Sequence, residues 1–130
     1  MTSGSVRISL AAEPGNVRRA RAAITELARR AGLPEDAVED VRLAVTEACT
    51  NVVRHAYPGG RPGTMRLEAT AGTDAFVVVV SDRGTGIVPT AGTPGLGLGL
   101  PLLVALTRTL EIEGDPGGGT IVRLTFALPA

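Results

Sequence analysis

The stretch Phe76-Val-Val-Val-Val-Ser-Asp-Arg-Gly-Thr-Gly86 runs from an apolar segment into an aspartate and two glycines. A short run of β-branched residues that ends at turn-forming residues predicts a strand over 76–81, buried on both faces. Asp82 then lies at the end of this strand, where Gly84 and Gly86 let the backbone turn tightly and approach a ligand closely. Asp-Arg-Gly is also common in plain turns, so the turn and ligand-site interpretations both stand here.

The segments on either side of this stretch predict a two-layer α/β sandwich of the α+β kind. Alternating and apolar runs indicate strands, and apolar residues at three- and four-residue steps indicate helices, with Asn16 as an N-cap and Pro34 in a first helical turn. The predicted strands are 6–10, 65–70, 76–81, 109–113 and 121–128, and the predicted helices are 17–31, 34–55 and 100–110. We expect the three helices on one face of a mixed, largely antiparallel sheet.

Length and composition predict a single globular domain over residues 1–130. Hydrophobic residues make up 44% of the chain and charged residues 20%, which is ordinary for such a domain. No repeat or compositional shift marks a second domain. The chain shows neither a secretory signal pattern nor an apolar run of membrane length, so we expect a cytoplasmic protein that does not bind membranes.

The charged and aromatic residues exclude several modes of binding. The formal net charge is zero, every basic side chain apart from His55 is arginine, and aromatic residues make up 2% of the chain. A balanced charge provides no field that attracts DNA, and single-strand binding usually needs aromatic stacking. The absence of lysine excludes a Walker-type phosphate loop. If ATP binds, backbone N–H groups, arginine and a metal ion must meet the phosphate charge.

Glu47 and Asn51 are four residues apart in a predicted helix, so their side chains share one face beside its apolar stripe. A carboxylate at that position is a candidate general base, and an amide oxygen is a suitable Mg²⁺ ligand. Taken alone, the pair is more typical of an ordinary exposed helix surface. Cys49 lies between them; with no Cys-His arrangement, we interpret it as a small apolar helix residue.

The segment Gly95-Leu-Gly-Leu-Gly-Leu100 directly precedes the third predicted helix. Small residues with available N–H groups beside a helix N-terminus form a natural anion site. A lone glycine repeat is equally compatible with a flexible loop. Its position after the Glu47 helix and the Asp82 turn is what favours a phosphate-binding interpretation.

In chain order, Glu47…Asn51, Asp82-x-Gly-x-Gly86 and Gly95-Leu-Gly-Leu-Gly99 resemble the N, G1 and G2 boxes of the GHKL ATPases. This Bergerat-fold superfamily includes gyrase and the histidine kinases. Two features resemble more closely the anti-sigma-factor serine kinases. One is the short lid, the glycine-rich segment 88–100, and the other is the pattern Glu-Ala-x-x-Asn-x-x-x-His-Ala-Tyr over 47–57. Gly118-Gly-Thr120 resembles the last nucleotide-contact motif of the same family.

The resemblance implies a role for each matching residue. Glu47 would be the catalytic base that accepts a proton from the attacking hydroxyl, and Asn51 would bind the nucleotide through Mg²⁺. Asp82 would bind the adenine amine, with Thr120 nearby. The other nucleotide-binding residues, which would shape the pocket and its lid, are Gly84, Gly86, Gly95, Leu96, Gly97, Leu98 and Gly99.

The resemblance also implies a function, with ATP and Mg²⁺ as cofactors. The chain would phosphorylate a serine on an anti-anti-sigma (STAS-type) partner and sequester a sigma factor, and so regulate transcription. A homodimer is expected on the same basis, whereas the balanced charge and the scarcity of aromatic residues predict no direct contact with nucleic acid. We do not expect a histidine kinase, which would need a phosphoacceptor histidine on an upstream helical dimerisation domain, because the only histidine, His55, ends the Glu47 helix.

One departure from the family pattern keeps a second hypothesis open. The segment 88–100 contains no charged residue, whereas related kinases often place a basic residue near the γ-phosphate. Phosphoryl transfer depends on positioning and charge stabilisation, which would then fall to Mg²⁺, loop N–H groups and Arg54 or Arg83. The alternative is a nucleotide-dependent partner-binding module without kinase activity. A scaffold that binds no nucleotide is a third, less favoured hypothesis.

Overall fold

The computed structural model describes residues 4–84 and 99–128, which form a sheet and a layer of helices. The strands are β1 (Gly4–Ala11), β2 (Thr64–Ala71), β3 (Ala75–Asp82), β4 (Thr109–Gly114) and β5 (Thr120–Ala127). The helices are α1 (Pro14–Arg30), α2 (Glu35–Asn51) and α3 (Gly99–Leu106), and a π-helical turn, Val52–Ala56, extends α2. No helix in the described residues is both long and apolar enough to cross a membrane.

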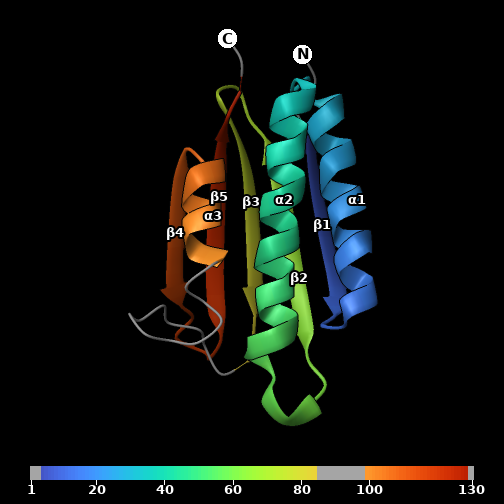
Figure 1. Cartoon of the computed structure of the whole chain (residues 1–130), viewed down its shortest axis with the longest axis vertical. Helices are drawn as coiled ribbons and strands as arrows, with labels where there is room; N and C mark the ends of the chain where they lie inside the picture. The colour runs from blue at the N-terminus through green and yellow to red at the C-terminus, as the bar shows by residue number, and fades with distance from the viewer. Residues whose placement is uncertain (1–3, 85–98, 129–130) are drawn as a thin grey trace.

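The five strands form one sheet in the order β1-β2-β3-β5-β4, and every neighbouring pair is antiparallel. Figure 1 shows α1, α2 and α3 on the same face of this sheet, with α3 over the β5 and β4 side. The predicted two-layer architecture is therefore confirmed. Asp82 ends the central strand β3, and its side chain lies on the buried face of that strand, which the helices cover.

The core lies between the helices and the covered face of the sheet. The helical spacing of apolar residues in α1 and α2 places Ile24, Leu27, Val41 and Val45 against that face, where each is at most 5% exposed. The sheet contributes Phe76, whose ring lies 6.5 Å from that of Phe126, together with buried aliphatic side chains at every second position of β2 and β3. Side chains between these positions point to the outer face.

The valine run of β3 is not buried on both faces, contrary to the sequence prediction. Phe76, Val78 and Val80 are buried, whereas Val77 and Val79 are partly exposed. Successive side chains of a strand alternate between faces, and the described helices cover only one face of this sheet. The outer face therefore presents apolar side chains at its centre.

Three predicted boundaries also change. The third helix ends at Leu106, not at residue 110, because Leu110 pairs with Leu124 in the sheet. Asn16 is not an N-cap: α1 already begins at Pro14, and the Asn16 side chain donates a hydrogen bond to the carbonyl of Ala11. Pro34 occupies the N-cap position of α2 and does not lie in its first turn.

Candidate functional site

Helix α2 places Glu47 and Asn51 on one side of the covered layer, each partly buried. Their neighbours Ala48 and Val52 are buried and fix the rotation of the helix against the core. The α-helix changes to a π-helical turn directly after Asn51, over Val52–Ala56. Such turns are rare and occur frequently at functional sites.

The first residue of α3, Gly99, lies against both of these side chains. A Cβ atom added at Gly99 would lie 2.5 Å from Glu47 Oε2 and 3.3 Å from Asn51 Nδ2. A side chain at position 99 would therefore require the Glu47 carboxylate to shift, whereas glycine leaves the carboxylate in place. The contact places the carboxylate and the amide beside the N-terminus of a helix, where backbone N–H groups favour anions.

Asp82 is a buried carboxylate, 5% exposed, at the end of the central strand. Its Oδ1 accepts a hydrogen bond from the backbone N–H of Gly84 at 2.9 Å. Burial raises the pKa of this carboxyl above its ordinary value of 3.8, while backbone hydrogen bonds from Gly84 and Thr120 partly oppose the rise. A buried acceptor of this kind is suited to a neutral or weakly polar hydrogen-bond donor on a ligand.

Thr120 lies opposite Asp82 in the β3–β5 register and is itself buried. The neighbouring Gly119 has a φ of +102°, and a Cβ atom there would overlap the backbone carbonyl of Asp82. The glycine is therefore required both by its backbone conformation and by the close approach of the two chain segments. This approach joins the sequence-predicted residues Asp82 and Thr120 although 37 positions of sequence separate them.

Gly84 brings the Asp82 turn into contact with the end of the α2 segment. A Cβ atom at Gly84 would overlap the backbone carbonyl of Ala56, in the π-helical turn. The helix that carries Glu47 and Asn51 and the turn that carries Asp82 are thus joined through a residue with no side chain.

Tyr57 connects the same parts through its hydroxyl group. The hydroxyl donates a hydrogen bond to the carbonyl of Thr64 at 2.6 Å and accepts one from the backbone N–H of Arg83 at 3.0 Å. Its ring packs so closely on Gly63 that a Cβ atom there would overlap it. The sequence pattern contains Tyr57 but assigns it no role. The sequence signal that could have indicated a structural role was the position of Tyr57 directly after the helix and before Pro58.

Replacing Tyr57 with phenylalanine is expected to destabilise the protein by about 1–3 kcal/mol, because two hydrogen bonds of about 0.5–1.5 kcal/mol each are lost. The Asp82-Arg83-Gly84 turn should loosen, and ATP affinity should fall by a few-fold. Urea unfolding and nucleotide titration measure the two effects. Thr64→Ala is the matched control because it retains the carbonyl acceptor. Unchanged stability and affinity in Tyr57→Phe would show that the hydroxyl does not position this turn.

The structure brings together Glu47, Asn51 and Gly99 on one side and Asp82, Gly84 and Thr120 on the other. The remaining sequence-predicted positions lie outside the described residues; these are Gly86, Gly95, Leu96, Gly97 and Leu98. Arg54 and Arg83, the two arginines considered for phosphate charge, are both exposed. The roles of all these residues stay predictions.

Cys49 lies in the core and is fully buried. Burial raises the pKa of its thiol to about 12. The thiol is therefore protonated at neutral pH and has little nucleophilic character, which agrees with its interpretation as an apolar helix residue.

The donor groups suit a nucleotide with a hydrated divalent ion better than a metal held by protein alone. Among the described residues, no group of three or more His, Cys, Asp or Glu side chains is placed to hold a metal. Mg²⁺ commonly takes one or two protein oxygens and completes its shell with phosphate and water. Asn51 can supply such an oxygen. A side chain at position 99 would fill the space beside Asn51, and Gly99 leaves that space free. The residues present therefore fit ATP with Mg²⁺.

Comparison with known proteins identifies the class of protein that this fold and site define. The histidine kinase-like ATPase domain family matches residues 10–126. This match spans most of the chain, and the chain therefore belongs to that family.

The individual relatives that match this chain include proteins named serine-protein kinase RsbW. The chain is 39% identical over 80 residues to serine-protein kinase RsbW of Listeria monocytogenes serovar 1/2a, covering 62% of this chain and 51% of that protein. It is 32% identical over 128 residues to serine-protein kinase RsbW of Halalkalibacterium halodurans, covering 87% of this chain and 78% of that protein. The matched region thus spans about half the length of the Listeria relatives and 78% of the length of the Halalkalibacterium halodurans relative.

A solved structure shows the same fold. The crystal structure of the RsbU and RsbW domains of Rv1364c from Mycobacterium tuberculosis superposes with a TM-score of 0.75 at 27% identity. The superposition covers 98% of this chain and 34% of that one. The helices and the antiparallel sheet are therefore arranged as in an RsbW-containing protein.

Proposed function

We propose that this chain is an ATP-dependent protein-serine kinase and anti-sigma factor. It phosphorylates a serine on an anti-anti-sigma (STAS-type) partner and sequesters a sigma factor when that partner is phosphorylated. Membership of the ATPase family and similarity to proteins named serine-protein kinase RsbW support the enzymatic part. The regulatory part rests on the resemblance of residues 47–57 to the anti-sigma kinases.

The contact of Gly99 with Glu47 and Asn51 is the observation that carries the kinase proposal. It places a carboxylate at the start of the helix that follows the glycine-rich segment. In the reaction, the partner's serine oxygen forms a bond to the γ-phosphorus of ATP, and the bond from that phosphorus to the β–γ bridging oxygen breaks. Glu47 accepts the serine proton, and ADP leaves. Asn51 would hold Mg²⁺, which when bound would neutralise charge on the phosphates.

Asp82 provides selectivity for adenine in this proposal. The N6 amine of adenine donates a hydrogen bond, and a buried carboxylate held by the Gly84 N–H is an acceptor for it. Thr120, opposite Asp82 in the sheet, would contact the same base. Gly119 lets its chain segment approach the backbone of Asp82 closely, and Gly84 lets the Asp82 turn approach the backbone of Ala56.

The alternative is a nucleotide-dependent binding module that sequesters its partner without chemistry. The observation that favours it is the absence of charged residues from segment 88–100. In that case nucleotide would bind and change partner affinity, but ATP would not be consumed. The cytoplasmic location expected from the sequence stays a prediction under either function.

One experiment, with γ-³²P-ATP, Mg²⁺ and the purified cognate anti-anti-sigma protein, distinguishes the kinase from the binding module. The kinase proposal expects label on a partner serine and none on a partner in which that serine is replaced by alanine. Nucleotide affinity is measured on the same preparation. ATP binding without transfer to the partner would exclude the kinase and support the binding module.

A further inference from the structure

Helix α3 is apolar on every side, including the sides that face solvent. Its sequence over 99–106, Gly-Leu-Pro-Leu-Leu-Val-Ala-Leu, contains no polar side chain. Leu103 is 1% exposed and anchors the helix in the core, whereas Leu102 is 38% and Val104 63% exposed. A helix that is apolar all round is normally buried all round. The exposed side of α3 therefore indicates a surface that another molecule covers.

The exposed side of α3 continues onto α2. The two helices pack against each other, and Figure 1 shows them running in opposite directions in the helix layer. Gly99 of α3 contacts Glu47 of α2. Leu102 lies about 4.5 Å further along α3 than this contact, and Leu43 lies about 6 Å along α2 in the same direction. The two leucines are therefore at similar heights on neighbouring helices, and Leu43 is itself 39% exposed.

The helical period places Leu102 on the side of α3 that is turned toward Glu47. At about 100° per residue, Leu102 lies about 60° around the helix from Gly99, whereas Val104 lies about 140° from it. Ala105 is also exposed and follows Leu102 by three residues, so it lies on the same side. Leu43, Leu102 and Ala105 thus form one apolar area beside the Glu47 carboxylate, the α2–α3 surface.

The chemistry proposed for Glu47 fixes where a substrate protein lies. The acceptor serine must approach within about 3 Å of the Glu47 carboxylate. The surface of the substrate protein around that serine must then cover the residues that border Glu47 on the outside of the helix layer. Leu43 and Leu102 are such residues. An apolar side chain close to the serine buries both leucines, and this burial contributes to affinity.

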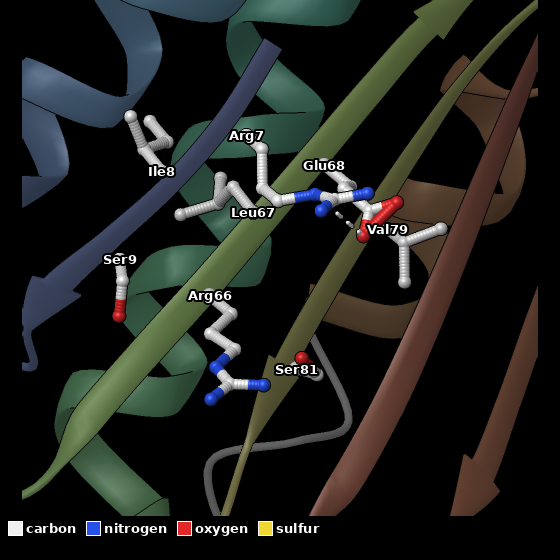
Figure 2. Close-up of a pocket in the computed structure, with 8 residues that line it drawn as sticks. All are labelled: Arg7, Ile8, Ser9, Arg66, Leu67, Glu68, Val79 and Ser81. Atoms are coloured by element: carbon white, nitrogen blue, oxygen red, sulfur yellow. Dashed lines mark ion pairs between the residues drawn. The ribbon is translucent and has the colours of Figure 1, made fainter. Parts of the chain in front are cut away.

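A second partly exposed apolar area lies on the opposite face of the molecule. Figure 2 shows Val79 on the outer face of the sheet, near the ion pair of Arg7 and Glu68. The sheet and the core separate this area from Glu47, which lies in the helix layer. A protein that delivers a serine to Glu47 must therefore contact the helix layer and not the outer face of the sheet.

One stripe of α2 extends from the α2–α3 surface toward the start of the helix. Its residues follow one another at steps of four, three and four positions, the spacing of one helix face: Asp36, Asp40, Leu43 and Glu47. Glu35 and Glu39 form ion pairs with arginines, whereas no ion pair within residues 4–84 and 99–128 includes Asp36 or Asp40. The far end of the stripe therefore complements a basic side chain on a docked protein.

We propose that the α2–α3 surface docks the protein that carries the acceptor serine. An apolar side chain next to that serine packs on Leu43 and Leu102, and a basic side chain further from the serine faces Asp36 and Asp40. This inference rests on the proposed function, because it takes the position of the serine from the role of Glu47. It adds the surface that selects the substrate and the kind of side chains that the substrate presents.

Substitution of the two leucines tests the apolar contact. Leu43→Gln and Leu102→Gln introduce a polar side chain with good helix propensity. Val104→Gln is the matched control, because Val104 is more exposed than either leucine but lies on another side of α3.

The leucine variants should bind the substrate protein more weakly without a change in the chemical step. With γ-³²P-ATP, Mg²⁺ and the cognate anti-anti-sigma protein, each should raise KM for that protein by about five- to tenfold, and both together by about 30- to 100-fold. The kcat at saturating partner, the ATP affinity and the circular dichroism spectrum should match wild type. Val104→Gln should match wild type in every measurement.

The acidic part of the stripe is tested by Asp36→Asn/Asp40→Asn. This variant should raise KM for the partner by about three- to tenfold at low salt, and added salt should reduce its difference from wild type. Glu35→Gln is the matched control, because Glu35 lies in the same first turn but is paired with Arg29. An unchanged KM in the aspartate variant at low salt would overturn the basic contact.

Partner binding without turnover separates this proposal from the kinase proposal. Affinity for the anti-anti-sigma protein is measured by titration with ADP and Mg²⁺ present, where no phosphate is transferred. If the wild-type chain transfers no phosphate from ATP, the kinase proposal fails. The docking proposal still requires the leucine variants to bind the partner more weakly by the same factors.

Three results would overturn the docking proposal. Wild-type KM and partner affinity in both leucine variants would place the partner elsewhere on the chain. An equal loss in Val104→Gln would attribute the effect to altered packing of α3. Weaker self-association or weaker sigma-factor binding in the leucine variants, with unchanged affinity for the anti-anti-sigma protein, would assign the surface to a different occupant.

Discussion

Replacing Glu47 with glutamine is expected to slow phosphoryl transfer by about 10²–10⁴-fold, the usual contribution of a well-placed general base. ATP affinity should stay near the wild-type value. Glutamine has the size of glutamate and fills the same space beside Gly99, but its amide does not accept the serine proton. Transfer is measured in single-turnover reactions with partner protein, and affinity is measured by nucleotide titration.

A matched control for this substitution is Glu39→Gln. Glu39 lies on the same helix and pairs with Arg42 at an exposed position, so its loss removes one carboxylate from α2 without touching Gly99. The control should retain wild-type transfer. Equal losses of transfer and ATP affinity in Glu47→Gln would assign Glu47 to nucleotide binding, and an unchanged transfer rate would exclude it as the base.

The fold was predictable because apolar spacing in this chain matches its structural periods. Val38, Val41, Val45 and Val52 follow one helical stripe, and all four are buried in the structure. The valines of β3 were harder to interpret, because valine is accepted on a half-exposed face as well as on a buried one. Only the position of the helices shows that Val77 and Val79 face outward.

The end of the third helix illustrates a second limit. The apolar residues through Leu106 and Leu110 fit helical spacing, and local pattern alone continues the helix. In the structure, Leu110 instead pairs with Leu124, and Arg108 donates its backbone N–H to Thr125. Pairing with a distant strand therefore ends the helix, and sequence periodicity does not report such pairing.

The candidate site was predictable where its residues are close in sequence. The four-residue step from Glu47 to Asn51 indicates a shared helix face, and the Asp82 turn follows from its glycines. The contact between Gly99 and Glu47 joins positions 52 residues apart, and no local spacing encodes it. The Tyr57 hydroxyl, which links Thr64 and Arg83, was missed for the same reason.

Replacing Asp82 with asparagine is expected to weaken ATP binding by about 10- to 100-fold. A hydrogen bond to a charged acceptor contributes about 1.5–3 kcal/mol, and about 1.4 kcal/mol corresponds to a factor of ten in Kd. Discrimination against GTP should fall as well, since guanine presents a carbonyl where adenine presents its amine. A carboxylate repels that carbonyl, whereas an amide can donate to it. Titration of both nucleotides into both proteins gives the ratio.

The pH dependence of stability separates this loss of affinity from unfolding. Burial raises the pKa of Asp82 above 3.8, so the folded state binds its proton more tightly than the unfolded state does. The stability that this group contributes is complete below about 3.8 and is lost as pH rises through the folded pKa. Asp82→Asn has no such loss, so we expect it to be at least as stable as wild type at pH 7, with the difference disappearing in acid. If Asp82→Asn is less stable than wild type at pH 7, its weaker ATP binding results from damage to the fold. The assignment of Asp82 as the hydrogen-bond acceptor for the adenine amine would then lose its support.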